Sequence, residues 1–231
     1  MSFSQQLCKE ADHIFEACYN HPFIRGIADG TLGKEQLIHY VKQDFEYLNA
    51  IMQAYAFGIT KSSRREDMEM FNTSISFVLN SETHPHVNLC NVAGVKYEDL
   101  QGYPLAPTAQ HYTRHMLNAS QSGTLGEVIA VVLPCPYIYL DIGERLVKEV
   151  NPDTSHPFYE WITFYGVQTE EVRMHKYLKR LDELAEAATE EERKRMKEHF
   201  MISCQLEYMF FDMAYTLQNW PVQKQCTAVS N

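Results

Sequence analysis

Residues 34–61, KEQLIHYVKQDFEYLNAIMQAYAFGITK, decide the fold class of the chain. The inward-facing positions recur at alternating steps of four and three residues, which is the spacing of one face of an amphipathic α-helix. These positions are Leu37, Val41, Asp44, Leu48, Ile51 and Tyr55. The stretch therefore predicts a long helix from Lys34 to Lys61 that buries one face in a protein core.

The same periodicity predicts helices on both sides of this segment. We expect them at residues 4–19, 63 to about 92, 108–119, 124 to about 150, 156–187 and 189 to about 220. Three Ser/Thr-x-x-Glu capping boxes, which begin at Ser63, Thr124 and Thr189, mark three of the helix starts. No pair of alternating segments joined by a hairpin turn indicates β-strands. The sequence therefore predicts an all-α bundle of about seven or eight helices.

Composition limits the number of domains and the kinds of partner. The 10 Gly and 9 Pro residues are scattered and form no linker, so we expect one helical domain at residues 1–220 and a flexible tail at 221–231. The formal net charge is −10, and the one basic cluster, Arg193–Lys197, is flanked by glutamates. A protein that binds a polyanion needs a basic stripe on its surface, and this chain lacks one. No nucleic-acid partner is therefore expected.

Two further features bear on the location of the protein. The first twelve residues have neither the basic nor the apolar region of a signal peptide. The longest apolar run, residues 128–140, is shorter than the roughly 20 residues that cross a bilayer. We therefore expect a cytoplasmic protein that has no membrane partner.

Two acidic residues stand where the helical pattern requires apolar ones. Asp44 is the first, and Glu207 holds the corresponding place in the last predicted helix. The inward positions of that helix are Phe200, Cys204, Glu207, Phe211 and Ala214. Burying an ionised carboxylate costs several kcal/mol unless it is paired or hydrogen-bonded. A structural acceptor would explain one such acid, whereas two of them favour a functional site.

The segment LPCPYIY, residues 133–139, places Cys135 between two prolines. Proline inside a helix removes a backbone donor and costs about 3 kcal/mol, and it disfavours the helical conformation of the preceding residue. We therefore expect the helix to kink or unwind at Cys135 and to aim the thiol into a cavity. A cysteine that is simply packed at a kink is the alternative. The 14 tyrosines, several of them near these positions, suit a pocket for a flat polar heterocycle.

These residues resemble the TenA family, also called thiaminase II, whose fold is heme-oxygenase-like. The matching segments are YVKQDFEYL at 40–48, LPCPYIY at 133–139, WITFY at 161–165 and QLEYMFFDMAY at 205–215. With the order of the helices they cover most of residues 1–220, and LPCPYIY is the most specific of them. Phe211 stands where a common form of the last motif has tryptophan.

The resemblance implies a homotetrameric aminopyrimidine aminohydrolase of thiamine salvage that needs no cofactor and no metal. The implied substrate is 4-amino-5-aminomethyl-2-methylpyrimidine, which is hydrolysed to the hydroxymethyl pyrimidine and ammonia, and thiamine is cleaved slowly. By matching positions, Cys135 is the nucleophile, Glu207 is the acid/base and Asp44 holds the pyrimidine amino group. Four tyrosines are expected to line the substrate pocket: Tyr47, Tyr112, Tyr139 and Tyr165.

A metal-dependent oxidase on the same fold is one alternative hypothesis. Glu82 with His86, and Glu171 with His175, repeat a four-residue spacing that allows two side chains on one helix face to bind iron. Heme binding is a further alternative on this fold. Its candidate ligands are His13, His21 and His39.

Two hypotheses need neither a metal nor turnover. A regulatory or carrier protein would bind the pyrimidine through Asp44 and the tyrosines, without any need for Cys135. A thiol redox switch would need a second cysteine near Cys135, and Cys204 is the candidate because it lies in the same seam as Glu207.

Overall fold

The computed structural model describes residues 1–81, 83–166 and 169–222, apart from the side chains of residues 83 and 169–172. Within these ranges the chain forms eleven α-helices, one 3₁₀ helix and no β-strand, which confirms the all-α prediction. The helices are α1 (Phe3–Tyr19), α2 (Pro22–Ala28), α3 (Lys34–Lys61), α4 (Arg65–Asn80), α5 (Thr83–Ala93), η1 (Tyr97–Leu100), α6 (Pro107–Ser122), α7 (Leu125–Val132), α8 (Pro134–Val150), α9 (Tyr159–Gly166), α10 (Thr169–Ala187) and α11 (Glu190–Thr216).

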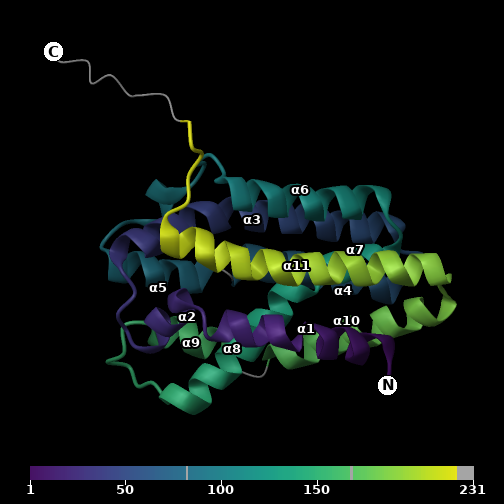
Figure 1. Ribbon diagram of the computed structural model, residues 1–231, viewed down its shortest axis with the longest axis horizontal. Helices are drawn as coiled ribbons and strands as arrows, with labels where there is room; N and C mark the ends of the chain where they lie inside the picture. Colours follow the sequence, from purple (N-terminus) through teal and green to yellow (C-terminus); the bar gives the residue numbers. More distant parts are fainter. Residues whose placement is uncertain (82, 167–168, 223–231) are drawn as a thin grey trace.

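The two longest helices, α3 and α11, organise the bundle. Helix α11 crosses the face of the molecule seen in Figure 1 and packs against α1, α3, α6, α7 and α8. Helix α3 packs against α4, α5, α6 and α7 as well as α11. Side chains on the inner faces of α3 and α11 therefore meet near the centre of the fold.

The predicted inward faces of both helices are confirmed. Every one of the predicted positions on α3, from Leu37 to Tyr55, is buried, as is every one on α11, from Phe200 to Ala214. The two acids lie within these faces, with Asp44 6% exposed and Glu207 2% exposed. The helical period therefore located two buried carboxylates correctly.

The helix predicted from residue 63 to about 92 is wrong in two respects. Helix α4 begins at Arg65 with Arg64 as its N-cap, and no side chain caps it. Glu66 is therefore the second helical residue and not the third, so it cannot complete a capping box with Ser63. The helix also ends at Asn80, before α5 begins at Thr83, and Leu79 at its end is 62% exposed.

The proline-flanked cysteine also differs from the expectation. The capping box of Thr124 and Glu127 opens α7 as predicted, but the apolar helix divides at Leu133 and α8 begins at Pro134. Cys135 is helical, so the prediction that Pro136 moves it out of the helical conformation is wrong. Pro134 and Pro136 occupy the first turn of α8, where backbone N–H groups have no partner within the helix and proline is tolerated.

The remaining segments differ from the prediction mainly at their ends. Residues 156–187, expected as one helix, contain α9 and α10 on either side of residues 167–168, which lie outside the described ranges. Helix α11 opens with the predicted capping box of Thr189 and Glu192 and ends at Thr216. Most of the predicted tail, residues 223–231, also lies outside the described ranges.

In the described part of the chain, one segment is long and apolar enough to cross a membrane. This segment, Leu125–Val150, comprises α7 and α8, and 67% of its most apolar window is buried inside the protein. A core helix of a soluble protein gives the same pattern.

Candidate active site

A small cavity lies between α3, α4, α8, α9 and α10. Five of the seven predicted site residues line it: Asp44, Tyr47, Cys135, Tyr139 and Tyr165. The remaining lining residues are Tyr40, Leu48, Ile51, Tyr55, Phe77, Val78, Pro136, Leu140 and Arg173. The other two predicted residues, Tyr112 and Glu207, are buried beside this wall.

Glu207 is buried, and its surroundings favour the protonated form of its carboxyl. The Tyr112 hydroxyl donates a hydrogen bond of 2.6 Å to Glu207 Oε1. Burial, with a smaller contribution from the charge of Asp44, raises the pKa of the Glu207 carboxyl to about 8. Hydrogen bonds of Glu207 with Tyr112, Cys135 and Tyr47 oppose this rise in its pKa but do not cancel it. Glu207 is therefore protonated at neutral pH and lies next to the cysteine.

Asp44 has a partner that the sequence did not indicate. His86 Nε2 lies 2.6 Å from Asp44 Oδ2, and the His86 side chain is 1% exposed. In the sequence analysis, His86 was considered only as a candidate iron ligand together with Glu82, a residue outside the described ranges. The imidazole instead reaches from α5 to the carboxylate on α3, 42 residues away in the chain.

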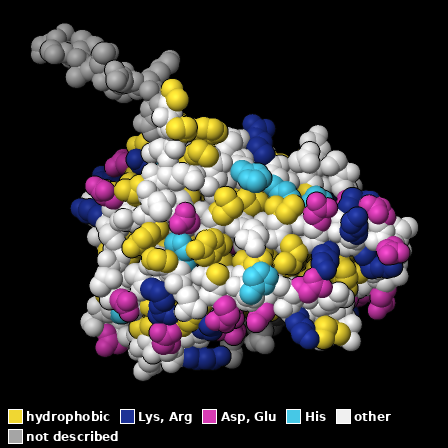
Figure 2. All heavy atoms as spheres, viewed as in Figure 1, with side chains coloured by type: hydrophobic (Ala, Val, Ile, Leu, Met, Phe, Trp, Pro, Cys, Tyr) yellow, Lys and Arg dark blue, Asp and Glu magenta, His cyan; other side chains and the backbone are white. Residues whose placement is uncertain are grey.

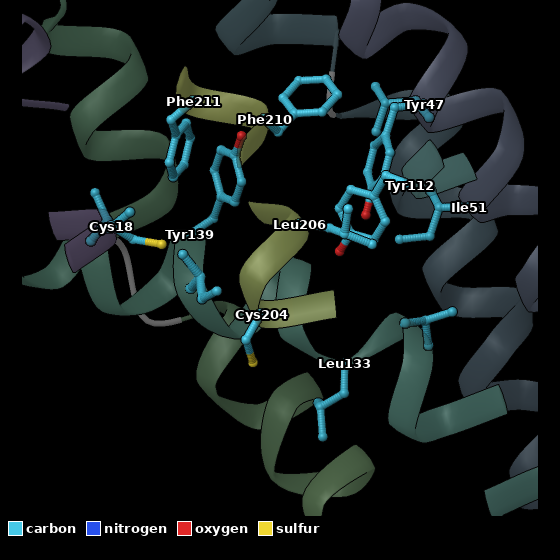
Figure 3. Packing of buried hydrophobic residues seen from close by; sticks show 14 of the residues in the cluster. Cys18, Tyr47, Ile51, Tyr112, Leu133, Tyr139, Cys204, Leu206, Phe210 and Phe211 are labelled. Carbon is cyan, nitrogen blue, oxygen red and sulfur yellow. The ribbon is translucent and has the colours of Figure 1, made fainter. Parts of the chain in front are cut away.

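Aromatic rings form the walls around these polar groups. Tyr139 lies 4.9 Å from Tyr165 between ring centroids and 5.7 Å from Phe211, and Tyr47 lies 4.9 Å from Tyr112. Figure 3 shows Phe211 beside Tyr139, and Tyr47 beside Tyr112. Such an enclosure suits a flat ring that stacks on tyrosines and bonds to polar groups at its edges.

Several tyrosine hydroxyls are placed to bond to a ligand. The Tyr47 hydroxyl is buried beside the Cys135 thiol and the Glu207 carboxyl, and it interacts with both. The hydroxyls of Tyr40 and Tyr139 are 2.5 Å apart, so one of the two donates to the other. Burial raises the pKa of all three phenols, which keeps them protonated as donors.

Three residues of the site were missed by the sequence analysis. Tyr40 carried a signal, because it precedes Asp44 by one helical turn and lies in a quoted motif. His86 appeared only as a metal candidate. Arg173 carried no signal, and its guanidinium carbon lies 4.2 Å from the ring centroid of Phe77 at the cavity wall.

The alternative hypotheses gain no support from the described residues. No group of three or more His, Cys, Asp or Glu side chains suited to a metal ion occurs among them. Of the proposed metal pairs, Glu82 and the side chain of Glu171 fall outside the description, and His175 is exposed. Cys204 is fully buried away from the cavity lining, and desolvation by burial raises its thiol pKa.

Comparison with known proteins connects this geometry to a family. A model of the TENA/THI-4/PQQC family matches residues 8–217. A curated aminopyrimidine aminohydrolase from Halalkalibacterium halodurans is 36% identical over 95% of this chain and 98% of that protein. The crystal structure of a TenA family transcription regulator from Silicibacter sp. TM1040 has a TM-score of 0.81 at 27% identity, covering 92% of this chain and 96% of that one.

A more distant structure bears on the fold alone. A domain of unknown function with a heme oxygenase-like fold, from Shewanella denitrificans OS217, has a TM-score of 0.64 at 16% identity and covers 92% of this chain and 90% of that one. The expected heme-oxygenase-like architecture is thereby confirmed.

Proposed function

Because the chain belongs to the TENA/THI-4/PQQC family, we propose that it is an aminopyrimidine aminohydrolase, a hydrolase of C–N bonds that serves thiamine salvage. One observation carries the proposal. A cysteine and a carboxylate held by a buried histidine line one tyrosine-rich cavity, and a second carboxyl whose pKa is about 8 is buried beside its wall. Perturbed acids beside a nucleophile in a cavity are typical of an active site.

The residues that line the cavity match the chemistry of 4-amino-5-aminomethyl-2-methylpyrimidine, and thiamine contains the same aminopyrimidine ring. Tyr139, Tyr165 and Tyr47 offer ring faces and hydroxyls to a flat heterocycle. Asp44, as an ionised acceptor, receives an N–H of the 4-amino group. A neutral Glu207 donates its proton toward a ring nitrogen. Recognition therefore uses two groups on the polar edge of the substrate ring, the 4-amino group as donor and a ring nitrogen as acceptor.

The reaction needs a nucleophile because an amine on a CH₂ beside an aromatic ring is a poor leaving group. The Cys135 thiolate adds to the ring while Glu207 protonates a ring nitrogen, which breaks the aromaticity and makes the ring electron-rich. The ring then expels the amine as ammonia and leaves an exocyclic methylene. Water adds to this methylene, and the C–S bond breaks as the ring nitrogen returns its proton to Glu207. This step restores the aromatic ring, regenerates the thiolate and releases the hydroxymethyl product.

We also propose that the enzyme is a homotetramer. Large hydrophobic side chains remain exposed on and just after α11, with Met209 41%, Tyr215 40% and Trp220 50% exposed. Figure 2 shows hydrophobic side chains spread over the face that α11 crosses. Exposed apolar surface of this kind marks association sites. Light scattering coupled to gel filtration should give a mass of four chains, and a monomer would refute this assignment.

The proposed location is the cytoplasm, and the proposed partners are limited to the small substrate. The five described cysteines, Cys8, Cys18, Cys90, Cys135 and Cys204, form no disulfide with one another, as expected in a reducing compartment. The net charge of −10 disfavours binding to nucleic acid or to anionic membranes.

The decisive test is ammonia release from 4-amino-5-aminomethyl-2-methylpyrimidine. The wild-type protein should release ammonia, and Cys135→Ser should reduce kcat at least about a thousandfold while still binding the pyrimidine. Cys8→Ser is the matched control, because Cys8 is also half-buried but lies in a separate hollow with Asp12 and Tyr137. No release by a wild-type protein that binds the pyrimidine would refute the hydrolase and favour the carrier hypothesis.

A further inference from the structure

The ring of His86 is fixed on several sides, although it is not among the residues that line the cavity. Its Nε2 contacts Asp44 Oδ2, and its ring stacks on Tyr97 at 5.7 Å between centroids with an interplanar angle of 17°. Tyr40 lies 6.2 Å away at a tilt of 55°. Tyr97 is in turn held edge-on by Phe45 at 6.1 Å. The imidazole therefore has little freedom to turn away from Asp44.

The contact determines which atoms of Asp44 face a ligand. An ionised carboxylate only accepts hydrogen bonds, so the 2.6 Å contact is an Nε2–H donated to Oδ2. This assignment holds for the neutral Nε2–H tautomer and for the doubly protonated ring alike. Because Oδ2 is occupied by His86 and no hydrogen bond to Oδ1 is found among the described residues, Oδ1 is left to accept from a ligand in the cavity that Asp44 lines.

We propose that His86 is the positioning residue that keeps Asp44 an oriented acceptor and thereby makes the site select a 4-amino over a 4-oxo pyrimidine. The proposal rests on the aminopyrimidine site proposed above. A 4-amino group offers an N–H to Asp44, whereas a 4-oxo group presents a second acceptor to it. Without the Nε2–H, the carboxylate is free to rotate and no longer presents one fixed oxygen to the N–H of a 4-amino group. Loss of His86 should therefore weaken the selection as well as the binding.

Two substitutions of His86 by a carboxamide side chain, glutamine or asparagine, test this assignment. Glutamine places its amide N–H near the position of Nε2, while asparagine is one methylene shorter and cannot reach Asp44. Calorimetry would give dissociation constants for 4-amino-5-hydroxymethyl-2-methylpyrimidine and for its 4-oxo counterpart with each variant. His86→Asn should weaken binding of the amino ligand by roughly 10- to 100-fold, the usual worth of a hydrogen bond to a charged group, and reduce the amino-to-oxo preference. His86→Gln should retain most of both.

Asn88→Ala controls for damage to α5. Asn88 is 8% exposed, two residues beyond His86, and its side-chain amide donates to the Pro157 carbonyl and not to the site. It should lower the melting temperature without changing the amino-to-oxo preference.

The outcomes separate this assignment from the proposed activity. An unchanged preference in a folded His86→Asn protein, or equal losses in the Gln and Asn variants, would overturn the assignment even if the wild type releases ammonia. A wild type that selects the amino ligand through His86 but releases no ammonia would uphold it and refute the hydrolase. A wild type that binds neither pyrimidine would overturn both.

Discussion

Replacing Glu207 by glutamine should make the stability of the protein less dependent on pH. Burial raises the pKa of this carboxyl from 4.5 to about 8. In the unfolded chain it titrates near its ordinary value, so between these limits the folded protein keeps a proton that the unfolded chain has lost. The free energy of unfolding therefore falls as the pH rises from about 4.5 to 8, and the loss is complete above that window.

The size of the effect follows from the width of the window. One pH unit corresponds to about 1.4 kcal/mol, so a rise from 4.5 to about 8 predicts a loss on the order of 5 kcal/mol. Glutamine has nearly the same shape, retains an oxygen that accepts from the Tyr112 hydroxyl, and does not titrate. Relative to the wild type, Glu207→Gln should gain several kcal/mol of stability between pH 5 and pH 8 while it loses catalytic activity.

The assay is urea unfolding of both proteins at pH 5, 6, 7 and 8 and at one protein concentration. Histidines whose pKa is lowered by burial also titrate in this range, with the opposite effect on stability. These are His21, His39, His115 and His199. They are common to both proteins and cancel in the difference. Parallel stability curves would refute the reasoning, because a Glu207 that is ionised at neutral pH cannot donate the proton.

Two further predictions concern the cavity. Asp44→Asn should raise KM for the aminopyrimidine by roughly 10- to 100-fold and move the alkaline fall in kcat to lower pH, because the charge of Asp44 no longer raises the pKa of Glu207. Steady-state kinetics from pH 6 to 9 measure both, and an unmoved alkaline limit would contradict the coupling. Gly143→Ala should cost about 1–3 kcal/mol in urea unfolding, since its Cβ would lie 2.6 Å from the backbone nitrogen of Gly166. In Gly126→Ala the Cβ meets only the flexible end of Met196, so equal losses in the two alanine variants would argue against a rigid α8–α9 contact.

The sequence predicted the features of this fold that depend on local period. The inner faces of α3 and α11 repeat every three or four residues, so a carboxylate at an inward position stood out without knowledge of its neighbours. Asp44 and Glu207 were found in this way. The capping boxes at Thr124 and Thr189 were equally local, because each closes within one helical turn.

Contacts between distant segments were beyond this kind of inference. The Asp44–His86 contact spans 42 residues and the Tyr40–Tyr139 contact spans 99, and no periodic signal connects such pairs. The start of α4 was mispredicted by one residue: the N-cap is Arg64 and not Ser63, so Glu66 is one position too early to complete a capping box. At Cys135 the cost of proline was applied to a helix interior, whereas the chain places the prolines in a first turn, where that cost is small.

The protonation state of Glu207 depends in part on the charge of Asp44. Asp44 receives an N–H from His86, while Glu207 receives the phenolic O–H of Tyr112 within a more enclosed environment. With the charge of Asp44 close by, a second negative charge on Glu207 is disfavoured, and this contributes to its pKa of about 8. An ionised acceptor beside a neutral donor matches the amino group and ring nitrogen of an aminopyrimidine. Selection of the ring and its protonation thus arise from one electrostatic arrangement, in which changing Asp44 must alter the pKa of Glu207.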